Sequence, residues 1–227
     1  MSGRGVTGIT RLIFVRHAES VANTTGSLDC AVPGPPLSPL GFEQAKLLPD
    51  ELLAELDGLA MHAVWASTMS RAQQTAEPVA ERWRLPLRVH PALHEGNVGD
   101  LHGRVDEEAH QALQDLLGRW LLDGDLTHCR PGGETGDGLV DRMRRVLPDV
   151  LHGSTFEMAG AVPGPGAAVV VSHGAILRVA LPQLCDGLSS TYTLAHHLPN
   201  TGRVIVDVLD PVTPVLRCRS WAGLTPR

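Results

Sequence analysis

The sequence predicts an α/β fold, a three-layer α/β/α sandwich with a largely parallel central sheet. Two patterns predict it: short apolar runs typical of strands recur along the chain, and segments with the apolar spacing of helices lie between them. Strands that alternate with helices form parallel sheets covered by helices on both faces. We expect residues 1–227 to form a single domain, with a helical insertion at about 97–133 over one edge of the sheet.

The predicted strands are short, largely apolar runs, and three of the six are rich in β-branched residues. They cover residues 12–15, 63–66, 85–89, 167–171, 203–208 and 215–219. The first and the fourth contain apolar residues only, which is typical of strands buried on both faces. After one intervening residue, each of these two strands is followed by a histidine.

Helix signals occupy the intervals between the strands. The first helix runs from Pro39 to about Gly58, and a second begins near Thr68. Three more cover 106–122, 135–151 and 174–184. We expect Pro49 to interrupt the first helix and Pro78 to kink or shorten the second, because proline lacks the N–H that the helix ladder needs.

Composition restricts the classes of function. No run approaches the roughly 18 apolar residues that cross a bilayer, and the first residues lack the apolar core of a signal peptide. We therefore expect a cytoplasmic protein without a membrane partner. The four cysteines are far apart and are expected to be free thiols. The formal net charge of −6 argues against nucleic acid as a partner, and an anionic small molecule would need a local cluster of arginines.

Charged and nucleophilic side chains gather where the predicted strands end. Arg16 and His17 follow the first strand, His173 follows the fourth, and Arg71 begins the helix after the strand at 63–66. The carboxyl ends of parallel strands meet at one edge of the sheet, where ligands bind. Guanidinium groups bind tetrahedral oxyanions, and a neutral imidazole can attack phosphorus. The pattern therefore predicts phosphoryl transfer with a histidine nucleophile.

Six ordered segments carry a family resemblance. Residues 12–23 read LIFVRHAESVAN, an apolar strand that ends in Arg-His, with an asparagine six residues after the histidine. The others are PLSPLGFEQA at 36–45, ASTMSRAQQTA at 66–76, LHEGNVGDLHG at 93–103, PGGET at 131–135 and VSHG at 171–174. From about residue 12 to 200 the chain is thus similar to the histidine phosphatase superfamily, also called phosphoglycerate mutase-like.

The resemblance implies a phosphomonoester hydrolase that acts on a small phosphorylated metabolite through a phosphohistidine intermediate, without a cofactor or a metal ion. It implies that His17 accepts the phosphoryl group and that Glu95 donates a proton to the leaving oxygen. Arg16, Arg71 and His173 would bind the transferred group. Further phosphate contacts are implied for Asn23 and the backbone of Gly174.

The sequence departs from the family pattern at three places. Ala18 stands where the family usually has glycine. Leu101 and His102 replace a common Trp-Glu pair, which would alter the wall of the pocket. The loop at 24–35 carries no lysine or arginine, so a basic substrate contact found in many relatives would be missing.

Other activities remain open on the sequence. The main alternative is a cofactor-dependent phosphoglycerate mutase, which needs further cations; Arg104, Arg119 and Arg130 in or beside the insertion could supply them. A second alternative is a catalytically inactive phosphate-binding module. A serine hydrolase built on Ser172 lacks the G-x-S-x-G pattern, and a zinc hydrolase lacks the ligand spacing. The sequence fixes neither the natural substrate nor the oligomeric state.

Overall fold

The centre of the molecule is a seven-stranded mixed sheet of order β3-β2-β4-β1-β6-β7-β5. The computed structural model describes residues 8–152 and 164–226. The strands are β1 (Gly8–Arg16), β2 (Ala60–Ala66), β3 (Leu87–Val89), β4 (Pro165–Ser172), β5 (Cys185–Asp186), β6 (Arg203–Asp210) and β7 (Val215–Trp221). β6 is antiparallel to β1 and β7, and the other pairings are parallel. The predicted α/β fold with a largely parallel sheet is confirmed.

Seven α-helices and two short 3-10 turns connect the strands in the described part of the chain. They are α1 (Val21–Thr25), α2 (Pro39–Leu56), α3 (Ser70–Trp83), η1 (Pro91–Leu93), η2 (Gly99–Leu101), α4 (Glu107–Leu121), α5 (Gly136–His152), α6 (Gly174–Leu184) and α7 (Ser190–Ala195). The longer helices begin where capping signals stand in the sequence. The Ser38 hydroxyl accepts the N–H of Gly41 at 3.0 Å ahead of α2, and the Asp106 carboxylate accepts the N–H of Ala109 at 3.1 Å ahead of α4.

Pro49 and Pro78 do not end their helices, so the predicted interruption at Pro49 is wrong. α2 and α3 continue past them for at least one further turn. Each proline removes one bond of the helix ladder. The buried face nevertheless continues on both sides of Pro49, where Leu48 and Leu52 are fully buried in the core. Packing of such a face supplies most of a helix's stability in a folded protein, which outweighs the lost bond.

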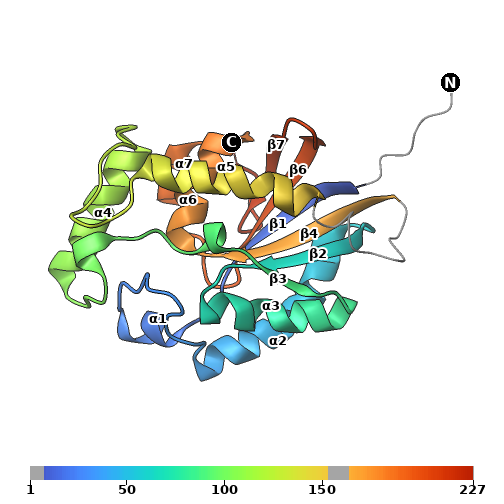
Figure 1. Ribbon diagram of the computed structural model, residues 1–227, viewed down its shortest axis with the longest axis horizontal. Helices are drawn as coiled ribbons and strands as arrows, with labels where there is room; N and C mark the ends of the chain where they lie inside the picture. The colour runs from blue at the N-terminus through green and yellow to red at the C-terminus, as the bar shows by residue number, and fades with distance from the viewer. Residues whose placement is uncertain (1–7, 153–163, 227) are drawn as a thin grey trace.

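Helices cover both faces of the sheet, which makes three layers (Figure 1). α2 and α3 lie on one face, and α5 and α6 lie on the other. Along β1, Leu12 and Phe14 pack in the core that includes α5 and α6, whereas Ile13 and Val15 pack in the core that includes α2 and α3. The four side chains are at most 1% exposed. β1 is therefore buried on both faces, as its uninterrupted apolar run predicts.

The pairing of β1 with β4 positions the two candidate histidines. The strands are adjacent and parallel, with Arg16 opposite Ser172 in register. Just beyond, the N–H of His17 donates to the carbonyl oxygen of Ser172 at 3.0 Å. His17 and His173 therefore leave the sheet next to each other at its carboxyl edge. On the other side of β4, β2 ends at the same edge and leads into α3, which carries Arg71.

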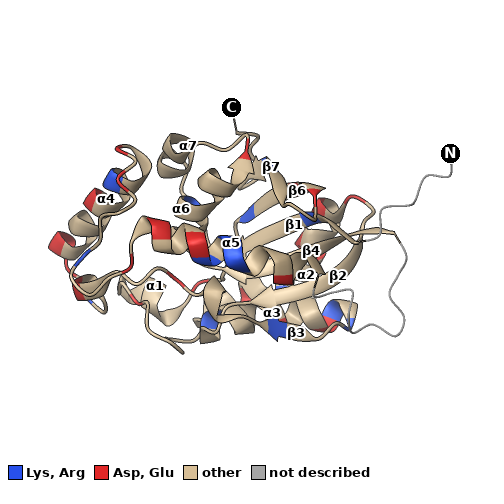
Figure 2. Cartoon of the chain, turned by 45° about the horizontal axis from the view of Figure 1, so that its top comes forward, with Lys and Arg blue, Asp and Glu red and all other residues tan. Residues whose placement is uncertain are grey.

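The segment from 97 to 133, expected as a helical insertion, contains α4 and η2. α4, drawn in green in Figure 1, lies at one end of the molecule beyond the sheet. Its residues Leu116, Leu117 and Trp120 pack in one cluster with Val179 of α6. Acidic and basic residues are interspersed along α4 and α5, as Figure 2 shows. No helix in the described chain combines the length and apolarity needed to span a membrane.

Candidate active site

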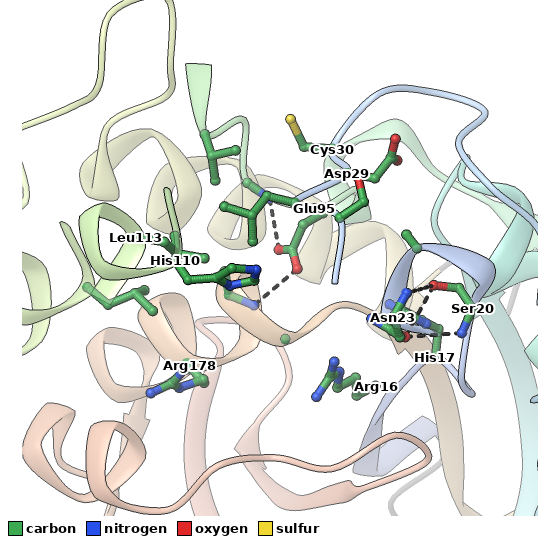
Figure 3. Close-up of a pocket in the computed structure, with 18 of the residues that line it drawn as sticks. Arg16, His17, Ser20, Asn23, Asp29, Cys30, Glu95, His110, Leu113 and Arg178 are labelled. Carbon is green, nitrogen blue, oxygen red and sulfur yellow. Dashed lines mark hydrogen bonds between the residues drawn. The ribbon is translucent and has the colours of Figure 1, made fainter. Parts of the chain in front are cut away.

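The predicted site residues gather around a cavity of about 300 Å³ at the carboxyl edge of the sheet (Figure 3). Those that line it are Arg16, His17, Asn23, Arg71, Glu95 and Gly174. His173 lies next to His17, and the centroids of the two rings are 5.0 Å apart. Strands β1, β4 and β2 each deliver part of this set, because their carboxyl ends meet here.

His17 is held as a neutral imidazole with an unprotonated Nε2. Its Nδ1 lies 2.7 Å from the carbonyl oxygen of Ala18, which can only accept, so Nδ1 carries the proton. The Nε–H of Arg71 donates to Nε2 at 3.1 Å, so Nε2 is the acceptor. Burial, followed by the charge of Arg71, lowers the pKa of His17 well below its ordinary value. The site therefore presents the nucleophilic form of the imidazole at neutral pH.

Arg71 links this nucleophile to the loop at 24–35. Its guanidinium Nη1 lies 3.4 Å from Oδ1 of Asp29, and Nη2 donates to the carbonyl oxygen of Asp29 at 3.0 Å. The residue is 3% exposed. The loop, in which the sequence shows no cation, thus contributes an anion to the site.

His173 is fully buried and precedes the first residue of α6. Its Nε2 lies 2.7 Å from the hydroxyl of Ser67, and its Nδ1 has no partner among the described residues. Burial, and then the neighbouring His17 and Arg71, lower its pKa well below the ordinary value. The adjacent Ser172 is also fully buried, and its hydroxyl donates to a backbone carbonyl at 2.8 Å. The hydroxyl of Ser172 is therefore inaccessible to a substrate, which argues against the serine-hydrolase alternative.

Arg16 closes another side of the cavity. Its Nη1 donates to the carbonyl oxygen of Leu198 at 2.7 Å and to Nε2 of His197 at 3.0 Å, since arginine has no acceptor. Its Nε is buried and has no partner within the described chain. Two nitrogen atoms of the site, Arg16 Nε and His173 Nδ1, are thus buried and unpaired. An unsatisfied buried polar group costs about 1–3 kcal/mol, so such atoms mark positions for a polar ligand.

The carboxylate of Glu95 lies at the N-terminus of α6. Its Oε1 accepts the N–H groups of Gly96 and Ile176 at 2.9 and 3.1 Å, and its Oε2 accepts that of Ala175 at 3.2 Å. The positive end of the helix dipole favours an acidic group there. Figure 3 shows the carboxylate pointing into the cavity, on the side away from Arg16.

Arg142 of α5 fixes the loop that carries Glu95. It is paired with Glu134 through Nε–Oε1 and Nη2–Oε2 contacts of 2.7 and 3.1 Å. It also donates to the carbonyl oxygens of Ala92, His94 and Glu95 at 2.6, 2.7 and 3.2 Å. Arg142 was not predicted from the sequence, because an arginine within a helix is usually a surface residue.

The two further phosphate contacts implied by the family resemblance have different surroundings. Asn23 Oδ1 accepts the backbone N–H and the hydroxyl of Ser20 at 3.0 and 3.2 Å, and Nδ2 of Asn200 at 3.2 Å. Its oxygen therefore serves the local fold and caps α1, and only Nδ2 is left for a ligand. At Gly174 a Cβ would lie 3.4 Å from Arg16 Nε, so glycine keeps space beside that unpaired nitrogen.

The departures from the family pattern are accommodated locally. Ala18 is fully buried, its backbone lies outside the left-handed region, and its N–H donates to the hydroxyl of Thr75 at 3.0 Å. A glycine is therefore not required at this position. Leu101 packs in a small buried cluster, and Nδ1 of His102 accepts the N–H of Cys30 at 3.2 Å.

The basic residues of the insertion do not line the cavity. Arg104 and Arg130 form ion pairs with aspartates, and Arg119 contacts a histidine ring. Arg178 of α6 does line the cavity, although it was not predicted; its position four residues after Gly174 is the signal that could have identified it. Nowhere in the described chain are three His, Cys, Asp or Glu side chains grouped as a metal site would require.

The chain is similar to known proteins over most of its length. The family model described as "Histidine phosphatase superfamily (branch 1)" matches residues 12–219. A 2,3-bisphosphoglycerate-dependent phosphoglycerate mutase of Nitrobacter winogradskyi is 31% identical over 198 residues, which cover 86% of this chain and 89% of that protein. The adenosylcobalamin/alpha-ribazole phosphatase of Escherichia coli is 29% identical over 174 residues, covering 77% of this chain and 78% of that protein.

Two further similarities concern the fold and the length of the chain. The structure of a mycobacterial glucosyl-3-phosphoglycerate phosphatase has a TM-score of 0.75 at 22% identity, covering 95% of this chain and 99% of that one. A PE-PGRS family protein of Mycobacterium tuberculosis is 28% identical over 202 residues, and the match covers 85% of this chain but 33% of that protein. The resemblance predicted from the six segments is confirmed.

Proposed function

Because the chain belongs to the histidine phosphatase superfamily, we propose that it hydrolyses a small phosphomonoester by transferring the phosphoryl group first to His17 and then to water. The observation that carries the proposal is the neutral His17, whose unprotonated Nε2 lies at a cavity bounded by arginines. The 29% identity to a phosphatase of Escherichia coli supports the same reaction class.

Each step of the proposed reaction uses an atom at the cavity. Nε2 of His17 attacks phosphorus, and the bond from phosphorus to the ester oxygen breaks. Glu95, whose carboxyl group lines the cavity, gives a proton to the leaving oxygen. Water then attacks the phosphohistidine, the carboxylate of Glu95 takes a proton from that water, and the phosphorus–nitrogen bond breaks to release phosphate.

The phosphoryl group carries negative charge during transfer, and hydrogen-bond donors held in fixed positions at the site stabilise that charge. The unpaired Nε of Arg16 is placed to bind the phosphoryl oxygens, and the guanidinium of Arg71, which donates to Nε2 of His17, holds its positive charge beside the reacting nitrogen. With the hydroxyl of Ser67 donating to Nε2 of His173, the proton of that neutral imidazole lies on Nδ1, which becomes a second donor. Binding of the phosphoryl group would thus satisfy the two buried nitrogens that lack partners.

A phosphoglycerate mutase is the second candidate, and the 31% identity to the Nitrobacter winogradskyi enzyme favours it. A mutase must hold a highly anionic acid while it reorients and must exclude water, which calls for extra cations. Here the loop at 24–35 contributes Asp29, Arg104 and Arg130 are engaged in ion pairs away from the cavity, and Arg178 adds a single arginine to its wall. These contacts support hydrolysis.

The test compares the two reactions on the wild-type protein. Phosphate release is measured with 4-nitrophenyl phosphate and a panel of phosphomonoesters, and isomerisation of 3-phosphoglycerate is measured with and without 2,3-bisphosphoglycerate. We expect steady phosphate release and slow or absent isomerisation. Efficient primer-dependent isomerisation with negligible phosphate release would make the protein a mutase. Absence of both reactions would support an inactive phosphate-binding module.

A further inference from the structure

Arg178 is a buried cation without an anionic partner at the wall of the cavity. It is 9% exposed, and no Asp or Glu of the described chain lies within ion-pair distance of it. Its Nε donates to the carbonyl oxygen of Thr193 at 3.1 Å, and its Nη2 donates to that of Leu194 at 3.2 Å. These bonds to α7 fix the guanidinium plane, and within the described residues Nη1 is left without an acceptor.

The position of Arg178 relates it to the phosphate site. It follows Gly174 by four residues on α6, so the two lie on the same helix face about 6 Å apart along the axis. Gly174 in turn lies against the guanidinium of Arg16. In Figure 3, Arg178 and Arg16 lie on the same side of the cavity, away from Glu95. Apolar side chains also line the cavity: Leu28, Val98, Leu113 and Leu117.

Among the arginines that line the cavity, Arg178 has no anionic partner in the described chain and is not one of the proposed phosphate contacts. Arg71 is paired with Asp29, and the unpaired Nε of Arg16 lies at the phosphate site. Burial lowers the pKa of Arg178, and the charge of Glu95 opposes that effect. A buried charge is costly unless it is paired and hydrogen-bonded, and functional sites keep such charges for a ligand that supplies the partner.

We propose that Arg178 binds a carboxylate of the substrate, so that the natural ester is a small phosphomonoester that also carries a carboxylate group. Gly174 and Arg178 lie one helical turn apart on α6 and both line the same cavity, which suits a small acid whose phosphate and carboxylate are close together. This inference rests on the proposed function, because it names the substrate class of the same site. Arg178 is then a residue that determines specificity and takes no part in bond breaking.

Two esters test this inference because they differ at one position. 3-Phosphoglycerate has a carboxylate where glycerol 3-phosphate has a hydroxymethyl group. We expect the wild-type kcat/KM for phosphate release to be at least about tenfold higher for 3-phosphoglycerate, as for one charge-assisted hydrogen bond. Arg178→Gln should bring this ratio close to one, chiefly by lowering kcat/KM for 3-phosphoglycerate. Arg119→Gln, which removes an exposed arginine of α4, is the matched control and should leave the ratio unchanged.

The outcomes separate the inference from the function on which it rests. Equal kcat/KM values for the two esters in the wild-type protein would overturn the role of Arg178, even if the variant failed to fold after losing its bonds to α7. A wild-type preference that persists in folded Arg178→Gln would overturn it as well. Failure of the wild-type protein to hydrolyse either ester or 4-nitrophenyl phosphate would instead contradict the proposed function.

Discussion

Replacement of Arg142 by methionine should both destabilise the protein and impair proton donation. The side chain of Arg142 is 8% exposed and that of Glu134 is 22% exposed, and the arginine donates five hydrogen bonds. Breaking a buried ion pair by removing one partner costs about 3–5 kcal/mol, because the other charge is left unpaired. Against a total stability of about 5–15 kcal/mol, this is a large fraction. For a chain of this size we expect a Tm lower by about 10 °C.

The matched control for this prediction lies two residues further along α5. Arg144 pairs with Asp141, and both side chains are more than half exposed, at 58% and 57%. Such a pair contributes less than about 1 kcal/mol, so Arg144→Met should unfold in urea almost as the wild-type protein does. Arg142→Met should also slow the hydrolysis of alkyl phosphates more than that of aryl phosphates. The substitution loosens the loop that carries Glu95, and alkyl leaving groups depend more on its proton. Equal urea midpoints for the two variants would refute the reasoning.

The remaining predictions concern pH, proton donation and metal ions. Because burial lowers the pKa of His17 and His173 well below 6.5, the acid limb of kcat/KM, corrected for ionisation of the ester, should lie below pH 6.5. For the same reason the unfolded chain binds more protons there, so the free energy of unfolding should fall as the pH drops below 6.5; a constant value would contradict this. Glu95→Gln should slow alkyl esters much more than aryl phosphates, and equal slowing would argue against its role as the acid. Activity should survive EDTA, because arginines supply the positive charge; loss of activity that zinc or magnesium restores would show otherwise.

Much of the fold follows from local patterns in the sequence. β1 and β4 are recognisable because their side chains are apolar on both faces, and α6 has the bounds that its pattern predicts, Gly174–Leu184. α1, α7 and β5 have two to six residues each, which is too short to show a period. The continuation of α2 through Pro49 depends on packing against distant parts of the chain, which no local rule contains.

Of the site residues, too, only some can be predicted from local patterns in the sequence. Arg16, His17 and His173 can be placed together from the sequence because parallel strands end at one edge. The roles of Arg142 and Arg178 depend on which groups they meet across the fold, and most of these partners are carbonyl oxygens, which every residue has. Sequence patterns therefore identify the reacting groups better than the residues that position them or select the substrate.

The central claim, that His17 carries the phosphoryl group, is tested most directly by trapping the intermediate. The wild-type protein is mixed with a radiolabelled phosphomonoester, quenched rapidly during turnover and digested, and the labelled peptide is located by mass spectrometry. We predict phosphate that is acid-labile and base-stable on His17, and none in a folded, inactive His17→Ala variant. Phosphate on another residue, or hydrolysis by His17→Ala at a rate near that of the wild-type protein, would contradict the account.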